Sequence, residues 1–325
     1  RKQAEVDVSR AVELGEGLPL FRAYLSSDRK QLVFVWHHVI SDLEGMFNKH
    51  AKHLFKEEGE RTQFGYQMDQ ATKPGENKRL STPAASILDV LNDGDRKLGF
   101  NEANYEVTKL VLPIKAKALY SLGLGANLPM SDIFSFIALR TATRYEEIEK
   151  RDGNNTMPLR PMLSPISLRS SSLDMDEGNN RAIRQFPFVF PLESLPEMHQ
   201  RIVSLEPTAS SYDTAGKLMK LARKASFMEH ALRKISMPDY ISNYFPLADV
   251  PLALGDSRLV AHNLRVPMVP FERTKFAWSN YNGEVQLYLH TDPLLIDKQR
   301  MFEAFRQASK EVLIYLAKGS HITSA

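Results

Sequence analysis

The alternation of apolar and polar positions predicts a mixed α/β chain. Apolar runs at 18–26 and 31–38 are typical of two neighbouring strands joined by a polar turn. Further strands are predicted at 105–112, 160–168, 186–190, 257–267, 273–279 and 283–290, and Asn282-Gly283 is a hairpin turn signal. Helical spacing of apolar residues predicts helices at 113–125, 131–148, 196–205, 215–235 and 297–318. We therefore expect an α/β fold in two layers, with strands packed against helices.

A polar break divides these predicted elements. The sequence Arg-Asp-Gly-Asn-Asn at 151–155 interrupts the helical pattern, and 325 residues are more than one core usually serves. We expect an N-terminal subdomain at 1–153 and a C-terminal subdomain at 154–325.

Two adjacent histidines end one of the predicted strands. The segment 32–42 reads Leu-Val-Phe-Val-Trp-His-His-Val-Ile-Ser-Asp. Successive strand residues face opposite sides, so His37 and His38 do not converge on one metal ion. Histidine is the usual proton carrier near neutral pH, which makes one histidine a candidate for chemistry and the other a structural residue. The alternative is that both are core histidines that hold a turn.

Composition and charge narrow the class of protein. Apolar residues make up 43% and charged residues 25%, as in a soluble globular protein. A net charge of +3 is too small to indicate nucleic acid. The lack of cysteine excludes disulfides, a cysteine nucleophile and thiolate metal sites, and it fits a reducing compartment. The apolar runs fall short of the roughly 20 residues of a transmembrane helix, and the chain begins with polar residues, so we expect a cytoplasmic protein.

Two later segments add to the histidine motif. They read Ser-Pro-Ile-Ser-Leu-Arg at 164–169 and Tyr-Ile-Ser-Asn-Tyr at 240–244. Together with His-His-Val-Ile-Ser-Asp at 37–42, and with Pro-Leu-Phe-Arg-Ala-Tyr-Leu at 19–25, they resemble the condensation-type acyltransferase superfamily. This group shares two histidines, three variable residues, aspartate and glycine. The segments look closest to its wax ester synthase/diacylglycerol acyltransferase-like and polyketide-associated branch, and they are also similar to condensation domains of nonribosomal peptide synthetases.

The resemblance implies a fold and an activity. The fold is a pair of chloramphenicol acetyltransferase-like subdomains, arranged in a V around a central channel. His38 is then the general base, which takes a proton from an acceptor hydroxyl or amine as that group attacks a thioester of coenzyme A or of a carrier protein. The resemblance implies no covalent enzyme intermediate, no permanently bound cofactor and no metal. The implied partners are the acyl donor, the acceptor, an acyl carrier protein and, by peripheral contact, a membrane.

The resemblance also assigns roles to the remaining site residues. His37 is structural, and Asp42 pairs with Arg169 across the subdomain contact. Ser242 and Asn243 lie in the channel and orient the substrates or the developing oxyanion. From the residues alone, Asp42 and Arg169 are equally well read as ordinary surface charges, and the Ser-Asn pair as a turn.

Two departures from the family pattern bear on these expectations. Leu43 occupies the position of the motif glycine, with a glycine only at Gly45. Only 36 residues precede His37, so the resemblance implies a first subdomain that is incomplete at its start: truncated, processed, or completed by another segment or chain.

Three hypotheses of function follow. The first is transfer of an acyl group from a thioester to an alcohol or amine. The second is a free-standing condensation domain that forms amides from carrier-bound substrates. The third is a non-catalytic relative that acts as a binding module. Basic residues along 215–235 suit coenzyme A phosphates or a carrier protein, or else a solvated helix face.

Overall fold

The computed structural model describes the chain in ten stretches. They are residues 21–36, 46, 54–58, 105–151, 159, 161–167, 181–205, 238–266, 268 and 272–320.

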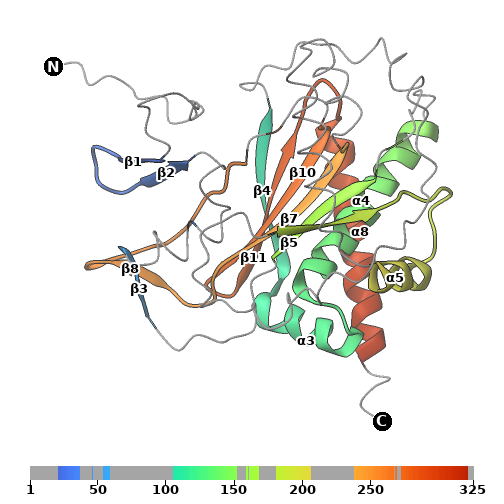
Figure 1. Cartoon of the computed structure of the whole chain (residues 1–325), viewed down its shortest axis with the longest axis horizontal. Helices are drawn as coiled ribbons and strands as arrows, with labels where there is room; N and C mark the ends of the chain where they lie inside the picture. Colours follow the sequence, from blue (N-terminus) through green and yellow to red (C-terminus); the bar gives the residue numbers. More distant parts are fainter. Residues whose placement is uncertain are drawn as a thin grey trace.

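A six-stranded mixed sheet forms the centre of the described structure (Figure 1). Its strand order is β4-β11-β10-β7-β5-β6. These strands are β4 (Glu106–Lys115), β5 (Met162–Ser167), β6 (Arg181–Phe186), β7 (Tyr240–Ala248), β10 (Thr274–Tyr281) and β11 (Glu284–Thr291). β7 runs parallel to both of its neighbours, and the other pairs are antiparallel.

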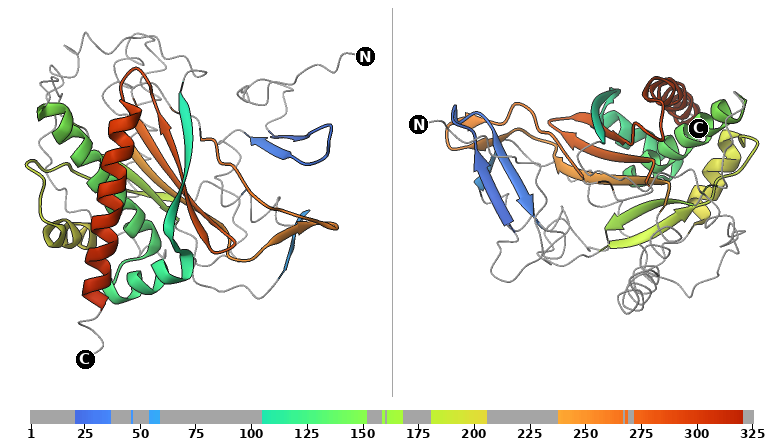
Figure 2. Two further views of the ribbon diagram at one scale, coloured as in Figure 1. Left: turned by 180° about the vertical axis from the view of Figure 1, so that it is seen from behind. Right: turned by 90° about the horizontal axis from the view of Figure 1, so that it is seen from above.

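Three helices cover one face of this sheet (Figure 2). They are α3 (Ala116–Ala126), α4 (Met130–Arg151) and α8 (Lys298–Ser320), and a fourth, α5 (Leu195–Ser204), lies beside α4. Phe134 of α4 stacks on Trp278 of β10 at 4.7 Å between ring centroids, and both side chains are fully buried. The main core therefore lies between the helices and this one face of the sheet.

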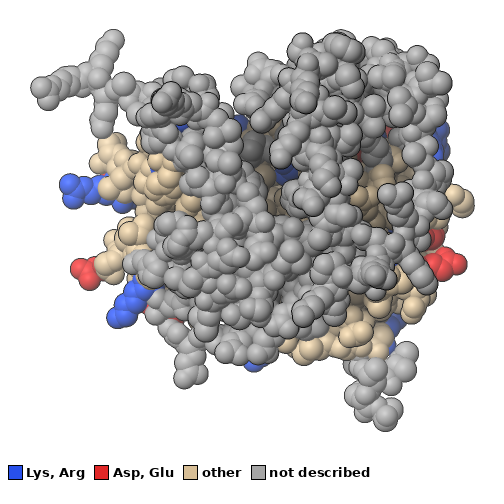
Figure 3. Space-filling model, in the orientation of Figure 1, with Lys and Arg blue, Asp and Glu red and all other residues tan. Residues whose placement is uncertain are grey.

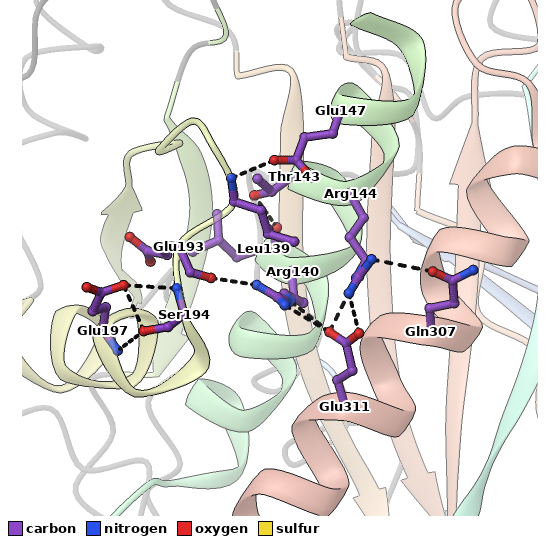
Figure 4. A network of polar contacts seen from close by, with 11 residues as sticks. Leu139, Arg140, Thr143, Arg144, Glu147, Glu193, Ser194, Glu197, Gln307 and Glu311 are labelled. Atoms are coloured by element: carbon purple, nitrogen blue, oxygen red, sulfur yellow. Dashed lines mark hydrogen bonds and ion pairs between the residues drawn. The ribbon is translucent and has the colours of Figure 1, made fainter. Parts of the chain in front are cut away.

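An ion-pair network joins the helices at their outer side (Figure 4). Glu311 of α8 binds Arg140 of α4, with 3.0 Å between Arg140 Nη2 and Glu311 Oε2, and it also pairs with Arg144. Arg140 donates a further hydrogen bond of 2.7 Å to the carbonyl of Glu193, which precedes α5. α5 begins with a capping box between Ser194 and Glu197. The network thus fixes the separation of three helices.

Two smaller sheets lie outside the main one. β1 (Phe21–Leu25) and β2 (Leu32–Trp36) form an antiparallel hairpin. β3 (Lys56–Glu57) pairs with β8 (Leu252–Leu254), which pairs with β9 (Ser257–Arg258). Arg258 Nε also bonds Glu58 Oε2 at 2.7 Å. The three-stranded sheet therefore ties the 54–58 segment to a part of the chain about 200 positions later.

Several predicted elements are confirmed. The β1–β2 hairpin, α5 and α8 lie where the sequence predicts them. Asn282 and Gly283 form the turn between β10 and β11, with φ of 49° and 75°. Such positive φ values at both central residues are why Asn-Gly suits this turn.

Other predictions are corrected. The helix expected to open at Pro113 begins instead at Ala116, because Pro113 lies in β4. The strand expected at 186–190 lies at 181–186, and Pro187, which has no backbone N–H, follows it. Of the strand expected at 257–267, the described residues 257–266 form a strand only at Ser257–Arg258. The turn considered for Ser242-Asn243 is absent, because both residues lie inside β7.

The expected boundary near residue 153 does not separate two sheets. β4, α3 and α4 precede it, yet they share one core with the elements that follow it, and β4 shares one sheet with β5, β6, β7, β10 and β11.

In the described part of the chain, no single helix has the length and apolar character to cross a membrane. α3 and α4 pass that test only when taken together, and they are bent by 90° at their junction.

Candidate functional site

Most of the predicted site residues lie outside the described residues. β2 ends at Trp36, so the histidine pair directly follows a formed strand, but His37, His38 and Asp42 are themselves not described. The same holds for Leu43 and for Arg169, and for the basic segment 215–235. The structure therefore places two of the predicted site residues, Ser242 and Asn243.

These two neighbours in β7 face opposite sides of the sheet. Burial alternates along the strand, with Tyr240, Ser242 and Tyr244 buried and the residues between them less so. Tyr244 packs on Phe134 of α4 at 4.8 Å between ring centroids, which identifies the buried side as the helix side. Ser242, at 2% exposure, therefore points into the core, whereas Asn243 points to the face that the helices leave uncovered.

The face that carries Asn243 is rich in polar side chains. Strand pairing and alternation place on it one set of residues, which we call the polar face: Lys109 of β4, Asn243 of β7, Lys275 and Ser279 of β10, and Gln286, Tyr288 and His290 of β11. Lys275, Ser279, Gln286 and His290 are buried although polar. Buried polar groups need hydrogen-bond partners, so this face must be covered by groups that supply them.

Segment 259–266 supplies part of that cover. From Ala261 to Val266 the even-numbered residues are less exposed than the odd-numbered ones, as expected for an extended segment lying on a surface. Hydrogen bonds from side chains of the sheet anchor the backbone of this segment. Tyr281 donates to the Leu259 carbonyl at 2.6 Å, and Tyr288 donates to the His262 carbonyl. Lys109 Nζ also reaches the His262 carbonyl at 3.3 Å. These contacts fix His262 above the polar face.

His262 has one satisfied and one unsatisfied ring nitrogen. Its Nε2 lies 3.0 Å from Ser279 Oγ, and Ser279 Oγ donates at 2.9 Å to the Phe245 carbonyl. Since the serine proton is used there, Nε2 must be the donor and Nδ1 must carry the lone pair. Nδ1 is buried and has no hydrogen-bond partner within the described structure. Burial, and secondarily the charge of Lys109, lower the pKa of His262 to about 4, so the ring is neutral at physiological pH.

Asn243 carries a second unsatisfied acceptor. Its Oδ1 is also buried and lacks a hydrogen-bond partner among the residues that are described. Six buried side-chain atoms of the described residues share this state, and the other four belong to the helix side: Glu146 Oε2, Arg184 Nε, Thr274 Oγ1 and Trp278 Nε1. The two on the opposite side are both hydrogen-bond acceptors.

His290 shows the contrasting, fully satisfied arrangement. Its Nδ1 donates at 2.9 Å to the Tyr288 carbonyl, and its Nε2 accepts at 3.0 Å from the backbone N–H of Val266. Burial lowers its pKa to about 4, with smaller contributions from the charges of Lys275 and Arg265. Both ring nitrogens are occupied, so His290 is a structural residue that anchors the end of segment 259–266.

A buried charge cluster fixes the start of β7. Glu146 of α4 is fully buried and accepts hydrogen bonds from Tyr240 and from Arg273, which precedes β10. Burial raises the pKa of Tyr240 well above its usual value, so its hydroxyl stays protonated. The cluster locks the first residue of the strand that carries Asn243. The sequence analysis did not predict this cluster. The one feature of the sequence that indicates it is Glu146, a glutamate on the otherwise apolar side of a long helix.

The described residues offer no candidate metal centre, because no three His, Asp or Glu side chains among them are suitably close. On the face shown in Figure 3, their basic and acidic side chains are scattered and form no single patch.

Comparison with known proteins identifies the fold. No protein-family model and no curated protein sequence matches the chain. Among solved structures it is similar to the wax ester synthase/diacylglycerol acyltransferase from Marinobacter aquaeolei VT8, with a TM-score of 0.53, 12% identity, and coverage of 95% of this chain and 74% of that one. It also matches the starter condensation domain of rhizomide synthetase (TM-score 0.45, 13% identity, 93% and 70% covered) and the first condensation domain of the CDA synthetase (0.41, 11%, 89% and 63%). The chain therefore shares the two-layer fold of that wax ester synthase/diacylglycerol acyltransferase.

Proposed function

We propose that the protein is an acyltransferase that moves an acyl group from a thioester to an acceptor hydroxyl, with His38 as the general base. The observation that carries the proposal is the fold shared with a wax ester synthase/diacylglycerol acyltransferase, in a chain whose His-His pair directly follows β2. On this proposal the acyl donor is coenzyme A or a carrier protein, as its thioester.

The proposed reaction needs one proton carrier. Neutral His38 accepts the proton of the acceptor hydroxyl while the oxygen attacks the thioester carbonyl carbon, giving a tetrahedral intermediate. That intermediate collapses by breaking the carbon–sulfur bond, and the imidazolium returns the proton to the departing sulfur. The products are an ester and a free thiol, and no enzyme nucleophile takes part. An imidazole with an ordinary pKa of about 6.5 is suited to both steps.

Asn243 supports the proposal as an orienting residue. It lies on the face of the sheet opposite the helices, and its Oδ1 has no partner within the described stretches. A buried acceptor without a donor costs free energy, roughly 1–3 kcal/mol, which a functional site tolerates when substrate supplies the donor. Ser242 faces the core, so in this proposal it supports the strand and does not touch substrate. Asp42 and Arg169 are proposed to form the ion pair that orients the histidine loop.

The test is product analysis with defined substrates. The purified chain is incubated with acyl-CoA or acyl-carrier donors and with alcohol or amine acceptors, and products are identified by mass spectrometry. We expect ester formation, and we expect His38→Ala to lower its rate by about 10²-fold or more, as loss of a general base does. The matched control is His53→Ala, which removes a histidine that lies close in sequence but outside the His-His motif.

Two results would contradict the proposal. One is the absence of transfer by the wild-type protein with every donor, and the other is an equal rate with His38→Ala. Amide products in place of esters would leave His38 as the base and change the acceptor class to amines.

A further inference from the structure

Segment 259–266 lies on the main sheet without joining it as a strand. From residue 260 to residue 266, its backbone makes no hydrogen bond to another backbone group of the described residues. Its anchors are side chains: the hydroxyls of Tyr281 and Tyr288, the amine of Lys109, and the rings of His262 and His290. A segment held in this way detaches from a sheet at a lower free-energy cost than a paired strand does, because the strands beneath it keep their hydrogen bonds.

His290 forms an anchor that requires a neutral ring. Its Nδ1 carries the proton that is donated to the Tyr288 carbonyl, so its Nε2 holds the lone pair that accepts the Val266 N–H at 3.0 Å. A second proton on this ring would occupy Nε2, and two N–H groups would then face each other. Protonation therefore turns this anchor from an attraction into a repulsion.

His262 forms a second anchor that favours a neutral ring. Its Nε2 donates to Ser279 at 3.0 Å, and its Nδ1 is buried without a hydrogen-bond partner in the described part of the chain. A proton on Nδ1 would create a buried cation whose new N–H group has no acceptor, which is unfavourable. Because His262 belongs to segment 259–266, lifting the segment brings the ring into water and removes this penalty.

The charges around the two rings act in the same direction. Among the described residues, the ionisable groups that face them are Lys109 of β4, Lys275 and Tyr281 of β10, Tyr288 of β11, Arg265 of the segment, and Tyr105. Glu272 brings a carboxylate to this group, but it is paired with Lys275 at 3.1 Å. Burial, and secondarily the positive charges, lower the pKa of both histidines to about 4.

We propose that segment 259–266 is an acid-released strap, which lifts off the polar face as a unit when His262 and His290 take up protons. In the lifted state both rings meet water, where the pKa of a histidine is about 6.5. Lifting therefore takes up as many as two protons, so the segment is held above about pH 6.5 and is released progressively as the pH falls toward 4. The inference does not depend on the proposed acyl transfer.

Ala277 is the position for a reporter beneath the segment. It is fully buried, and alternation along β10 places it between Ser279 and Lys275, which lie at the two histidine anchors. The chain has no cysteine, so Ala277→Cys introduces a single thiol. The matched control is Ala308→Cys, because Ala308 is equally buried but lies in α8, in the core on the other side of the sheet.

The experiment measures how fast each thiol reacts with a dithiodipyridine reagent between about pH 7.5 and 5. Each rate is divided by the rate for the urea-unfolded protein at the same pH, which removes the effect of thiol ionisation. We expect this relative rate at residue 277 to rise about 50-fold from pH 6 to pH 5, as two protons with pKa values of about 4 and 6.5 in the two states require. His262→Gln and His290→Gln, each in the Ala277→Cys background, should reduce the rise to about sevenfold, and the double variant should abolish it.

The control thiol separates release of the segment from unfolding of the whole chain. At every pH the relative rate at residue 277 should exceed that at residue 308 by about 100-fold or more. It should also depend only weakly on urea, because local release exposes little surface. Leu264→Cys, on the inward side of the segment, reports the same event if Ala277→Cys does not fold, and the two single histidine variants decide the test if the double variant does not fold.

Three results would overturn the inference. A relative rate at residue 277 that stays constant from pH 7.5 to pH 5 would show that release is not coupled to protons. An unchanged rise in the histidine variants would show that other groups take up the protons. Equal relative rates at residues 277 and 308 would show that the segment leaves the sheet only when the whole chain unfolds.

Discussion

Gly123 is the position in α3 where a methyl group has no room. A Cβ there would lie 2.6 Å from the Leu128 carbonyl oxygen and 2.9 Å from Ile133 Cδ1. The Gly123 carbonyl also accepts from the Leu128 N–H at 2.9 Å, so the loop into α4 folds back on this residue. We expect Gly123→Ala to lower the free energy of unfolding by about 1–2 kcal/mol, as overpacking outweighs the gain in helix propensity. Urea unfolding followed by circular dichroism measures it.

Gly319 is the matched control for this substitution. It lies near the end of α8, and a Cβ there would meet nothing within 4 Å. Gly319→Ala should leave stability unchanged or raise it by up to about 0.5–1 kcal/mol. Similar effects at the two glycines would contradict the steric argument.

His290 makes stability depend on pH. Its folded pKa of about 4 lies below the unfolded value of about 6.5, so the unfolded chain binds more protons between these values. Stability is therefore complete above about pH 6.5 and is lost as the pH falls toward 4. Protonation would remove the acceptor for the Val266 N–H and would add a positive charge beside Lys275 and Arg265. The loss from this residue reaches roughly 2 kcal/mol at about pH 5.

Comparing the pH dependence of stability in the wild type and in a variant without His290 isolates the contribution of this residue. Urea unfolding of the wild type and of His290→Gln is compared at about pH 7.5 and 5. The variant should be less stable at the higher pH, because two hydrogen bonds are lost, but its stability should fall less between the two values. An identical fall in both proteins would show that His290 does not titrate as described.

The α4–α5–α8 network is the clearest test at the scale of elements (Figure 4). Arg140 has a side-chain exposure of 9%, and Glu311 is its only carboxylate partner among the ion pairs of the described residues. Glu311→Gln would leave a nearly buried guanidinium without its counter-charge. We expect a loss of about 1–3 kcal/mol, less than for a fully buried pair because Glu311 is one-third exposed. Chemical denaturation at neutral pH measures the change.

The same helix provides the control. Glu303 pairs with Arg306 at 3.2 Å, but both side chains are largely exposed. Glu303→Gln should therefore change stability by no more than about 0.5 kcal/mol. Losses of equal size at 303 and 311 would mean that burial does not set the strength of these pairs.

Elements with a strong local signal could be predicted, and those shaped by distant partners could not. The β10–β11 hairpin follows from Asn282-Gly283, since the turn requires positive φ. Segment 259–266 shows the alternating pattern of a strand, but tyrosine side chains and His290 hold its backbone where a neighbouring strand would. Pro113 reads as a helix start, and it is tolerated in β4 because β4 is an edge strand of the sheet.

At the site, the sequence offered Ser242 and Asn243 together, and it could not tell which of them faces away from the helices. Ser242 and Asn243 are equal candidates by residue type, and their separation depends on which face α4 covers. No sequence pattern marked His262 as a site residue, because its position depends on a hydrogen bond to Ser279, which lies 17 positions later in β10. Such pairs are set by sheet register, which the sequence encodes only through the whole fold.

At the scale of the whole molecule, the three-stranded sheet β3-β8-β9 forms a small bridge between the 54–58 segment and the main sheet. β3 pairs with β8 through two residue pairs, and Glu58 binds Arg258. Tyr281, at the end of β10, holds this bridge to the main sheet: its hydroxyl accepts from the Leu252 N–H at 3.1 Å and donates to the Leu259 carbonyl at 2.6 Å. One phenol thus links the main sheet to both ends of the β8–β9 hairpin.

Tyr281→Phe should loosen the bridge and leave the core intact. The variant keeps the ring, which is 3% exposed, and leaves one N–H and one carbonyl without their partner. We expect hydrogen exchange to become about tenfold faster in 252–259 and in 56–57, because β3 has no other strand partner in the described structure. Peptides from α8 should exchange as in the wild type, since that helix packs on the opposite face. Hydrogen–deuterium exchange read by mass spectrometry compares the regions within one sample. Unchanged exchange at 252–259, or a uniform increase that includes α8, would show that the bridge is not held by this hydroxyl.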